Sequence, residues 1–103
     1  MTFCFDIDDT ICDTVYGNYA SATVRPHMVD QLKRIHEAGH RIIFLTARGT
    51  VTGIDWRELT ESQLQAWGIL YDELHFGKPD ADVFVGDKMI NVSEFDQEKQ
   101  VTL

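Results

Sequence analysis

Short runs of apolar residues recur along the chain, and polar or turn-forming residues follow each run. The run RIIFLTA carries no charge after its first residue, which is typical of a strand buried on both faces of a parallel sheet. The runs predict strands at residues 2–7, 41–47, 73–76 and 82–87. The end of the chain, residues 98–103, fits either an edge strand or a frayed end.

Two longer segments have the spacing of amphipathic helices. In residues 25–40 apolar side chains recur every three or four positions, and Pro26 suits the first turn of a helix. In residues 59–69, Thr60 and Gln63 have the spacing of a capping box, in which each side chain would bond a backbone amide of the first turn. We therefore predict a helix in each segment.

This order of elements, strand, helix, strand, helix, strand, strand, is typical of a parallel sheet with helices on its faces. We expect an α/β fold with a central, mostly parallel sheet. The chain length fits a single compact domain, residues 1–103. Ligands of such sheets bind beyond the carboxyl ends of the strands, so the polar residues after each apolar run are the candidates for chemistry.

Composition narrows the classes of function. The formal net charge of −8, from 17 acidic and 9 basic residues, argues against binding to nucleic acid or to an anionic membrane. An anionic small substrate stays open, because a metal ion or local basic groups can invert the field. No apolar run approaches the roughly 18 residues of a membrane span. Cys4 and Cys12 do not make a disulfide scaffold, so we expect a cytoplasmic protein.

All four predicted strands end in polar groups that can converge on one rim of the sheet. They are Asp6, Asp8 and Asp9 after the first strand, Thr46 and Arg48 after the second, Lys78 after the third, and Asp87, Lys88 and Asn91 after the fourth. A plain acidic turn would explain only the first cluster. The four together are stronger evidence for a site than any single residue.

The acidic members of this rim would repel one another. Asp6 and Asp8 are two apart, so an extended backbone points both side chains the same way, and Asp87 would add a third negative charge. Mg²⁺ would relieve the repulsion, because it takes oxygen ligands and needs few carboxylates. With the cation of Lys78 and the hydroxyl of Thr46, the site suits a phosphoryl group, whose oxygens need charge neutralisation during transfer.

In these residues the chain resembles the haloacid dehalogenase (HAD) superfamily of phosphatases. DIDDT at 6–10 matches the family's first motif, Asp-x-Asp-x-Thr, after an apolar strand. Thr46 in FLTARG matches the second motif, Lys78 in GKP the third and Asp87 in VFVGD the fourth. The matches occur in the family's order and span residues 3–91. The resemblance implies a three-layer α/β/α Rossmann-like fold and a Mg²⁺-dependent phosphomonoester hydrolase.

The resemblance also implies a role for each matched residue. Asp6 would attack phosphorus to form an aspartyl-phosphate and would ligate Mg²⁺. Asp8 would protonate the leaving oxygen and later activate water, while its backbone carbonyl ligates the metal. Thr46 and Lys78 would hold phosphate oxygens, and Asp87 would complete the metal site.

The fourth motif departs from the family's pattern, which often has a second acidic residue beside the first or about four positions on. Gly86 and Asn91 occupy those positions here, which leaves the metal affinity open. Asn91 could still hydrogen-bond a metal-bound water. Arg48 has two interpretations, a contact to a substrate anion or a surface ion pair. Trp56 likewise fits either substrate binding or packing beneath its loop.

Family members usually carry a cap domain that selects the substrate, but the spacing here leaves only a small flap, roughly residues 11–25, and a loop at 48–58. The chain is therefore similar to the capless subgroup, whose open site is often closed by a neighbouring subunit in a homo-oligomer. The chain is also similar to short HAD proteins of bacterial polysaccharide and sugar-phosphate pathways. We expect a sugar phosphate, a glycan precursor or another bulky phosphate as substrate.

Three alternatives stay open at this stage. The chain could transfer the phosphoryl group to an acceptor other than water, hydrolyse a nucleotide, or be a HAD-like regulatory or binding domain with a weak site. The intact acidic pair, Asp6 and Asp8, argues against a decayed site, whereas Gly86 and Asn91 leave that alternative open.

Overall fold

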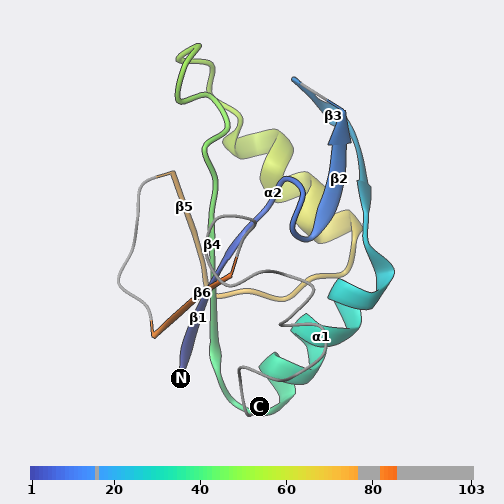
Figure 1. The fold of residues 1–103 in the computed structure, drawn as a ribbon, viewed down its shortest axis with the longest axis vertical. Coiled ribbons are helices and arrows are strands. Elements are labelled where there is room, and N and C mark those ends of the chain that lie inside the picture. The colour runs from blue at the N-terminus through green and yellow to red at the C-terminus, as the bar shows by residue number, and fades with distance from the viewer. Residues whose placement is uncertain (16, 77–81, 86–103) are drawn as a thin grey trace.

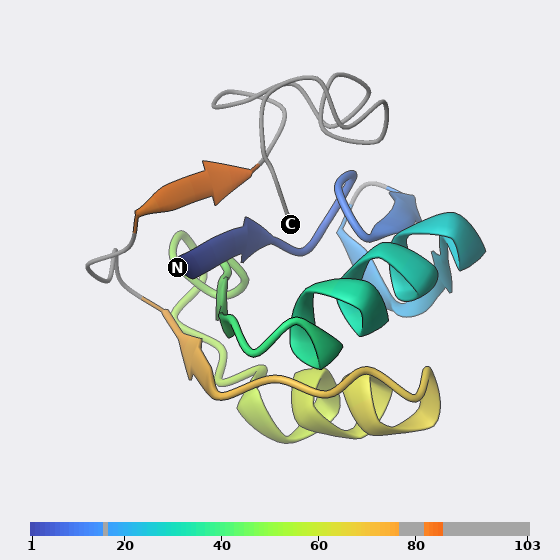
Figure 2. The ribbon, with the colours of Figure 1, turned by 90° about the horizontal axis from the view of Figure 1, so that it is seen from below.

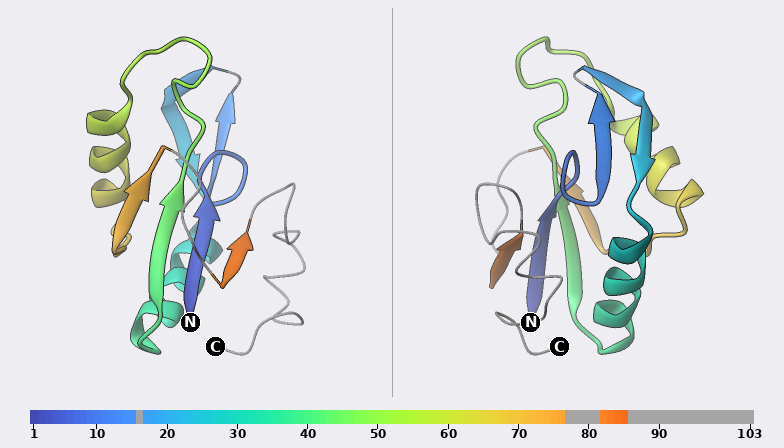
Figure 3. Two further views of the ribbon diagram at one scale, coloured as in Figure 1. Left: turned by 90° about the vertical axis from the view of Figure 1, so that its left-hand side faces the viewer. Right: turned by 45° about the vertical axis from the view of Figure 1, so that its right-hand side comes forward.

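The central element of the fold is a parallel sheet (Figure 1), whose strand order β5-β4-β1-β6 can be followed in the left view of Figure 3. The computed structural model describes residues 1–15, 17–76 and 82–85. The strands of this sheet are β1 (Thr2–Asp6), β4 (Arg41–Leu45), β5 (Glu73–His75) and β6 (Val83–Val85). Each of the three strand pairs is parallel. The four predicted strands are confirmed.

Strand β1 lies inside the sheet, between β4 and β6. Three successive residues of β1, Phe3, Cys4 and Phe5, are at most 1% exposed, although their side chains alternate between the two faces. The middle of β4 is buried in the same way, at Ile42, Ile43 and Phe44. Both faces of these two strands are therefore covered, as the continuous apolar runs predicted.

Both described helices, α1 (Pro26–Glu37) and α2 (Arg57–Ala66), lie on the same face of the sheet (Figures 2 and 3). The chain moves in one direction from β1 to β4 to β5, and right-handed crossovers in one direction put their helices on one face. The α/β class with a parallel sheet is thus confirmed. The second helical layer that the resemblance implies stays a prediction, because residues 86–103 lie outside the described residues, and with them the segment 98–103.

The start of α2 differs from the predicted one. The helix begins at Arg57, and the first-turn amide of Arg57 donates to Asp55 Oδ1 over 3.0 Å. The predicted capping box of Thr60 and Gln63 is therefore wrong. Thr60 instead lies a full turn inside the helix and is 1% exposed. In α1, by contrast, Pro26 occupies the first helical turn as expected.

A β-hairpin that the sequence analysis did not predict connects β1 to α1. It pairs β2 (Cys12–Val15) antiparallel with β3 (Asn18–Val24) and occupies the stretch expected to form a small flap. In Figure 1 the hairpin lies at the end of the molecule toward which β1 and β4 point. An ion pair ties its base to the start of α1, with Arg25 Nη2 donating to Asp13 Oδ1 over 2.7 Å. The hairpin therefore lies where the candidate site was predicted.

Candidate active site

The carboxyl ends of three neighbouring strands form one edge of the sheet. Asp6, the last residue of β1, is in register with Leu45, the last residue of β4. Thr46 follows directly, and its backbone amide donates to the carbonyl oxygen of His75 at the end of β5, over 3.0 Å. Adjacent parallel strands thus bring Asp6 and Thr46 to the same rim, as the sequence predicted.

The structure describes only part of the predicted site. Lys78, Asp87 and Asn91 lie outside the described residues, so their placement stays a prediction. The predicted site residues that it does describe are Asp6, Asp8, Thr46 and Arg48.

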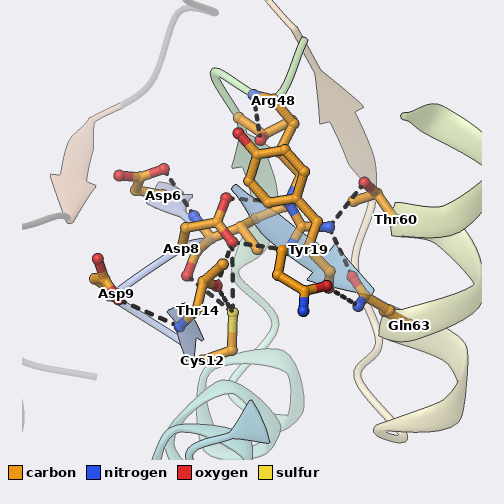
Figure 4. Close-up of polar contacts among 12 residues, drawn as sticks. Asp6, Asp8, Asp9, Cys12, Thr14, Tyr19, Arg48, Thr60 and Gln63 are labelled. Carbon is orange, nitrogen blue, oxygen red and sulfur yellow. Dashed lines mark hydrogen bonds and ion pairs between the residues drawn. The ribbon is translucent and has the colours of Figure 1, made fainter. Parts of the chain in front are cut away.

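A tight turn after β1 determines where the first two of these residues point. The strand ends at Asp6, whose Oδ1 accepts from the backbone amide of Ile7 over 2.8 Å. Asp9 has a φ of 61°, and its amide donates to the carbonyl oxygen of Cys12 over 2.8 Å, which closes the turn. In Figure 4 the carboxylates of Asp6 and Asp8 consequently extend in different directions. The expectation that both point the same way is not met, because Asp6 bonds the amide of Ile7 whereas Asp8 bonds Arg48.

The Asp8 carboxylate is held by side chains from two other segments. Arg48 donates from Nε to Oδ2 over 3.0 Å and from Nη2 to Oδ1 over 2.8 Å. The hydroxyl of Thr14, on the hairpin, donates to the same Oδ1 over 2.6 Å. The thiol of Cys12 makes a weaker contact with Oδ1 at 3.9 Å. The side chain of Asp8 is 25% exposed, so its carboxylate still reaches solvent.

Arg48 is buried inside the site. Its side chain is 0% exposed, and its Nη1 donates to Thr60 Oγ1 over 3.1 Å and to Gln63 Oε1 over 2.6 Å. Its guanidinium carbon lies 4.8 Å from the centre of the Tyr19 ring, within the range of a cation–π contact. The ion pair of Arg48 is therefore internal, so of its two interpretations the surface ion pair is wrong.

Thr60 and Gln63 belong to the candidate site through their bonds to Arg48, although the sequence analysis assigned them to a capping box. Their spacing of three places both on one face of α2. That face bonds Arg48, and Gln63 Nε2 also donates to the carbonyl oxygen of Tyr19 on the hairpin over 2.6 Å. The only sequence signal for this role was the pair that resembled a capping box.

Thr46 also contacts Arg48, through the backbone. Its Oγ1 accepts from the amide of Arg48 over 3.1 Å, and the residue is 2% exposed. This bond uses a lone pair of the hydroxyl and leaves its proton for donation to another acceptor.

A hollow of about 340 Å³ adjoins these residues. It is lined by Arg48, Gly49, Thr50, Ile54, Asp55, Trp56 and Phe76. Trp56 also packs edge-on against Tyr19, with 5.1 Å between the ring centres. Trp56 thus packs against the hairpin and lines the hollow as well, so its two interpretations are not exclusive.

The predicted Mg²⁺ site can be tested only in part. Within residues 1–15, 17–76 and 82–85, no group of three His, Cys, Asp or Glu side chains is placed to hold a metal ion. Asp6 and Asp8 are the two predicted ligands within these residues, and Arg48 bonds both oxygens of the Asp8 side chain. A carboxylate at a strand end suits a hard cation that keeps several waters, and the third predicted ligand is Asp87.

Comparison with known proteins bears on the fold. No protein-family model matches the sequence, and no curated protein matches it. Among solved structures, the chain is similar to an MCSG target from Vibrio cholerae, determined by crystallography, with a TM-score of 0.77. The two chains are 24% identical, and the match covers 99% of this chain and 89% of the other. At this identity the similarity shows a shared α/β fold alone.

Neither α1 nor α2 has the length and apolar character that a membrane-spanning helix needs, and no other helix lies within the described residues.

Proposed function

We propose that the chain is a Mg²⁺-dependent phosphomonoester hydrolase of the HAD type that acts through an aspartyl-phosphate on Asp6. The observation that carries this proposal is the position of the first two motifs. Strands β1 and β4 are parallel neighbours, so Asp6, Asp8 and Thr46 all follow strand ends on one rim. The order of the four motifs along the sequence supports the same assignment.

The proposed reaction gives each residue of the rim one task. An Asp6 carboxylate oxygen attacks phosphorus, the bond from phosphorus to the leaving oxygen breaks, and that oxygen takes a proton from Asp8. Water then attacks the aspartyl-phosphate and gives its proton to Asp8, which restores both carboxyl groups. The Thr46 hydroxyl donates to a phosphate oxygen. Bound Mg²⁺, held by Asp6, the Asp8 carbonyl and Asp87, would neutralise charge on the phosphoryl group.

The hollow beside the rim supports a substrate with an organic group of moderate size. Its volume of about 340 Å³ falls within the range of small-molecule sites. Trp56 and Phe76 offer apolar surface and Asp55 a hydrogen-bond acceptor, which suits a sugar phosphate or another bulky phosphate. The same proposal includes closure of the open rim by a second copy of the chain. It also includes a cytoplasmic location, with Cys4 and Cys12 outside any disulfide.

Phosphate release tests the proposal directly. The protein is incubated with p-nitrophenyl phosphate, sugar phosphates and nucleotides, in Mg²⁺ or in EDTA. We expect metal-dependent release of phosphate, and loss of that release in Asp6→Asn, because an amide cannot form the acyl phosphate. Asp30→Asn, an exposed change on α1, is the matched control and should keep full activity.

The outcomes separate the alternatives. Release from nucleotides alone would make the chain a nucleotide phosphatase, and transfer to an added alcohol would indicate a phosphotransferase. No release from any substrate would overturn the enzyme proposal in favour of a binding or regulatory domain. Unchanged turnover in Asp6→Asn would overturn the assignment of the nucleophile.

A further inference from the structure

We propose that Arg48 is a positioning residue that fixes the Asp8 carboxylate so that Oδ2 is the atom that exchanges the proton with the leaving group. This inference rests on the proposed phosphatase function. It concerns a residue whose contacts run to Asp8, to α2 and to the hairpin (Figure 4).

The two oxygens of Asp8 are not equivalent. Oδ1 accepts from Arg48 Nη2 at 2.8 Å and from the Thr14 hydroxyl at 2.6 Å, which together occupy its two lone pairs. Oδ2 accepts from Arg48 Nε at 3.0 Å. In the part of the chain that the structure describes, Oδ2 has this single donor and keeps a lone pair for a proton. Oδ2 is therefore the oxygen that carries the proton to the leaving group.

The Arg48 guanidinium, which bonds Asp8, also has contacts that fix its own position. Thr60 and Gln63 accept from Nη1, and the Tyr19 ring lies against the guanidinium. With a fully buried side chain, Arg48 has no room to follow a substrate. A buried guanidinium without its carboxylate would also be costly, so the pair is expected to persist throughout the reaction. These contacts define a rigid support, because the planar guanidinium fixes both the distance and the angle of the carboxylate.

The support joins three separate segments. Arg48 follows β4, Gln63 belongs to α2, and Thr14 belongs to the hairpin. Gln63 closes the loop of contacts by donating from Nε2 to the Tyr19 carbonyl at 2.6 Å. Any movement of the hairpin relative to α2 would therefore displace Asp8, and the hairpin is a structural part of the acid–base machinery.

This role makes a specific prediction about leaving groups. A p-nitrophenolate ion is stable and departs with little protonation, whereas phenolate needs a proton from Asp8 as it leaves. Because kcat/KM covers the steps up to alcohol release, it senses this proton transfer and not the later attack of water. A poorly positioned Asp8 should thus lower kcat/KM much more for phenyl phosphate than for p-nitrophenyl phosphate, two substrates of similar shape.

The variants to compare are Arg48→Lys and Thr14→Val. Lysine keeps the charge but cannot hold both carboxylate oxygens in a planar fork, and we expect kcat/KM for phenyl phosphate to fall about 100-fold, as for a misplacement of about 1 Å. For p-nitrophenyl phosphate we expect a fall of at most about threefold. Thr14→Val removes one donor to Oδ1 and should give a smaller change in the same direction. Thr23→Val, on the same hairpin, and Arg41→Lys, at the far end of β4, are the matched controls.

The results distinguish this inference from the proposed function. A selective loss with phenyl phosphate in both Arg48→Lys and Thr14→Val supports the positioning role. Equal losses for the two substrates, or a rise in KM alone, would overturn it and leave the phosphatase proposal intact. Because Thr14→Val changes a half-buried hairpin residue, it provides the answer even if Arg48→Lys does not fold. A wild-type protein inactive toward both substrates would overturn the function itself.

Discussion

The fold alters the ionisation of Cys12, whose thiol lies next to Asp8. Burial, the largest influence, raises the pKa of its thiol above the ordinary value of 9.0, and the Asp8 carboxylate acts in the same direction. The Thr14 hydrogen bond and Arg48 act in the opposite direction. The thiol therefore stays protonated at neutral pH, where it serves as a small buried side chain with a weak hydrogen bond to the Ile7 carbonyl.

This raised pKa predicts a pH dependence of stability. Above pH 9.0 the Cys12 thiol of the unfolded chain ionises while that of the folded protein stays protonated, so the unfolded state gains stability. The free energy of unfolding should be unaffected by Cys12 below about pH 9 and should decrease as the pH rises toward the raised pKa. Urea titrations at about pH 7.5 and pH 10 measure this decrease.

Cys12→Ala is the variant that isolates the contribution. It loses some packing at every pH, but its free energy of unfolding should decrease less between the two pH values than that of the wild type. Tyr71, whose pKa is also raised chiefly by burial, contributes equally to both proteins and cancels in the difference. The same decrease in both proteins would contradict the assignment.

At the scale of single residues, the sequence predicted that Asp6 and Thr46 would share one rim but not how the side chains after β1 would be oriented. Asp6 and Thr46 could be placed because strand ends determine their position. The direction of Asp8 depends on Asp9, which adopts a φ of 61° that its sequence context did not indicate. The burial of Arg48 depends on α2, which is distant in sequence from Asp8.

At the scale of elements, the loop between β4 and α2 depends on a glycine. Gly49 has a φ of 84°, and a Cβ atom there would lie 2.1 Å from the carbonyl oxygen of Ile54. The loop closes further through the amide of Gly53, which donates to the Gly49 carbonyl over 2.8 Å. Because Gly49 follows Arg48 directly, the backbone that starts this loop also orients the guanidinium.

Gly49→Ala should therefore destabilise the loop and disturb Asp8. We expect the free energy of unfolding to fall by about 1–3 kcal/mol from the positive φ alone, with a further loss from the contact to Ile54. Gly53→Ala is the matched control, since its φ is 75° but nothing lies within 4 Å of the added Cβ. Urea unfolding should show a larger loss of unfolding free energy in Gly49→Ala than in Gly53→Ala. Equal losses would mean that the backbone near Ile54 moves away from the added Cβ without loss of stability.

The elements themselves were predictable to different degrees. The four strands of the parallel sheet were predictable from apolar runs, and the two helices from helical spacing. The observed bounds agree with the predicted ones within a few residues. The hairpin was missed because β3 is mostly exposed, with a mixture of polar and small residues that offers no strong alternation. Its stability comes from tertiary contacts such as those of Tyr19 with Arg48 and Trp56, which local sequence does not reveal.

At the scale of the whole molecule, the chain carries an excess of negative charge, and the proposed metal site includes acidic residues. The formal net charge is −8, and Asp6 lies at the rim where three strands end. A divalent cation would stabilise the folded state in two ways, by binding at the rim and by screening the general repulsion. The two effects can be separated, because only the first needs Asp6.

Thermal unfolding with and without Mg²⁺ makes that separation. A cation that binds the folded state alone adds about 2.7 kcal/mol when its concentration is about 100 times the dissociation constant, which corresponds to a rise in Tm of about 10 °C or more in a domain of this size. Asp6→Asn should lose most of this rise, since it removes one of the proposed ligands. Asp30→Asn removes the same charge from the exposed side of α1 and should keep the rise. If both variants responded to Mg²⁺ as the wild type does, the cation would act by screening, and the acidic rim would need a partner other than a metal.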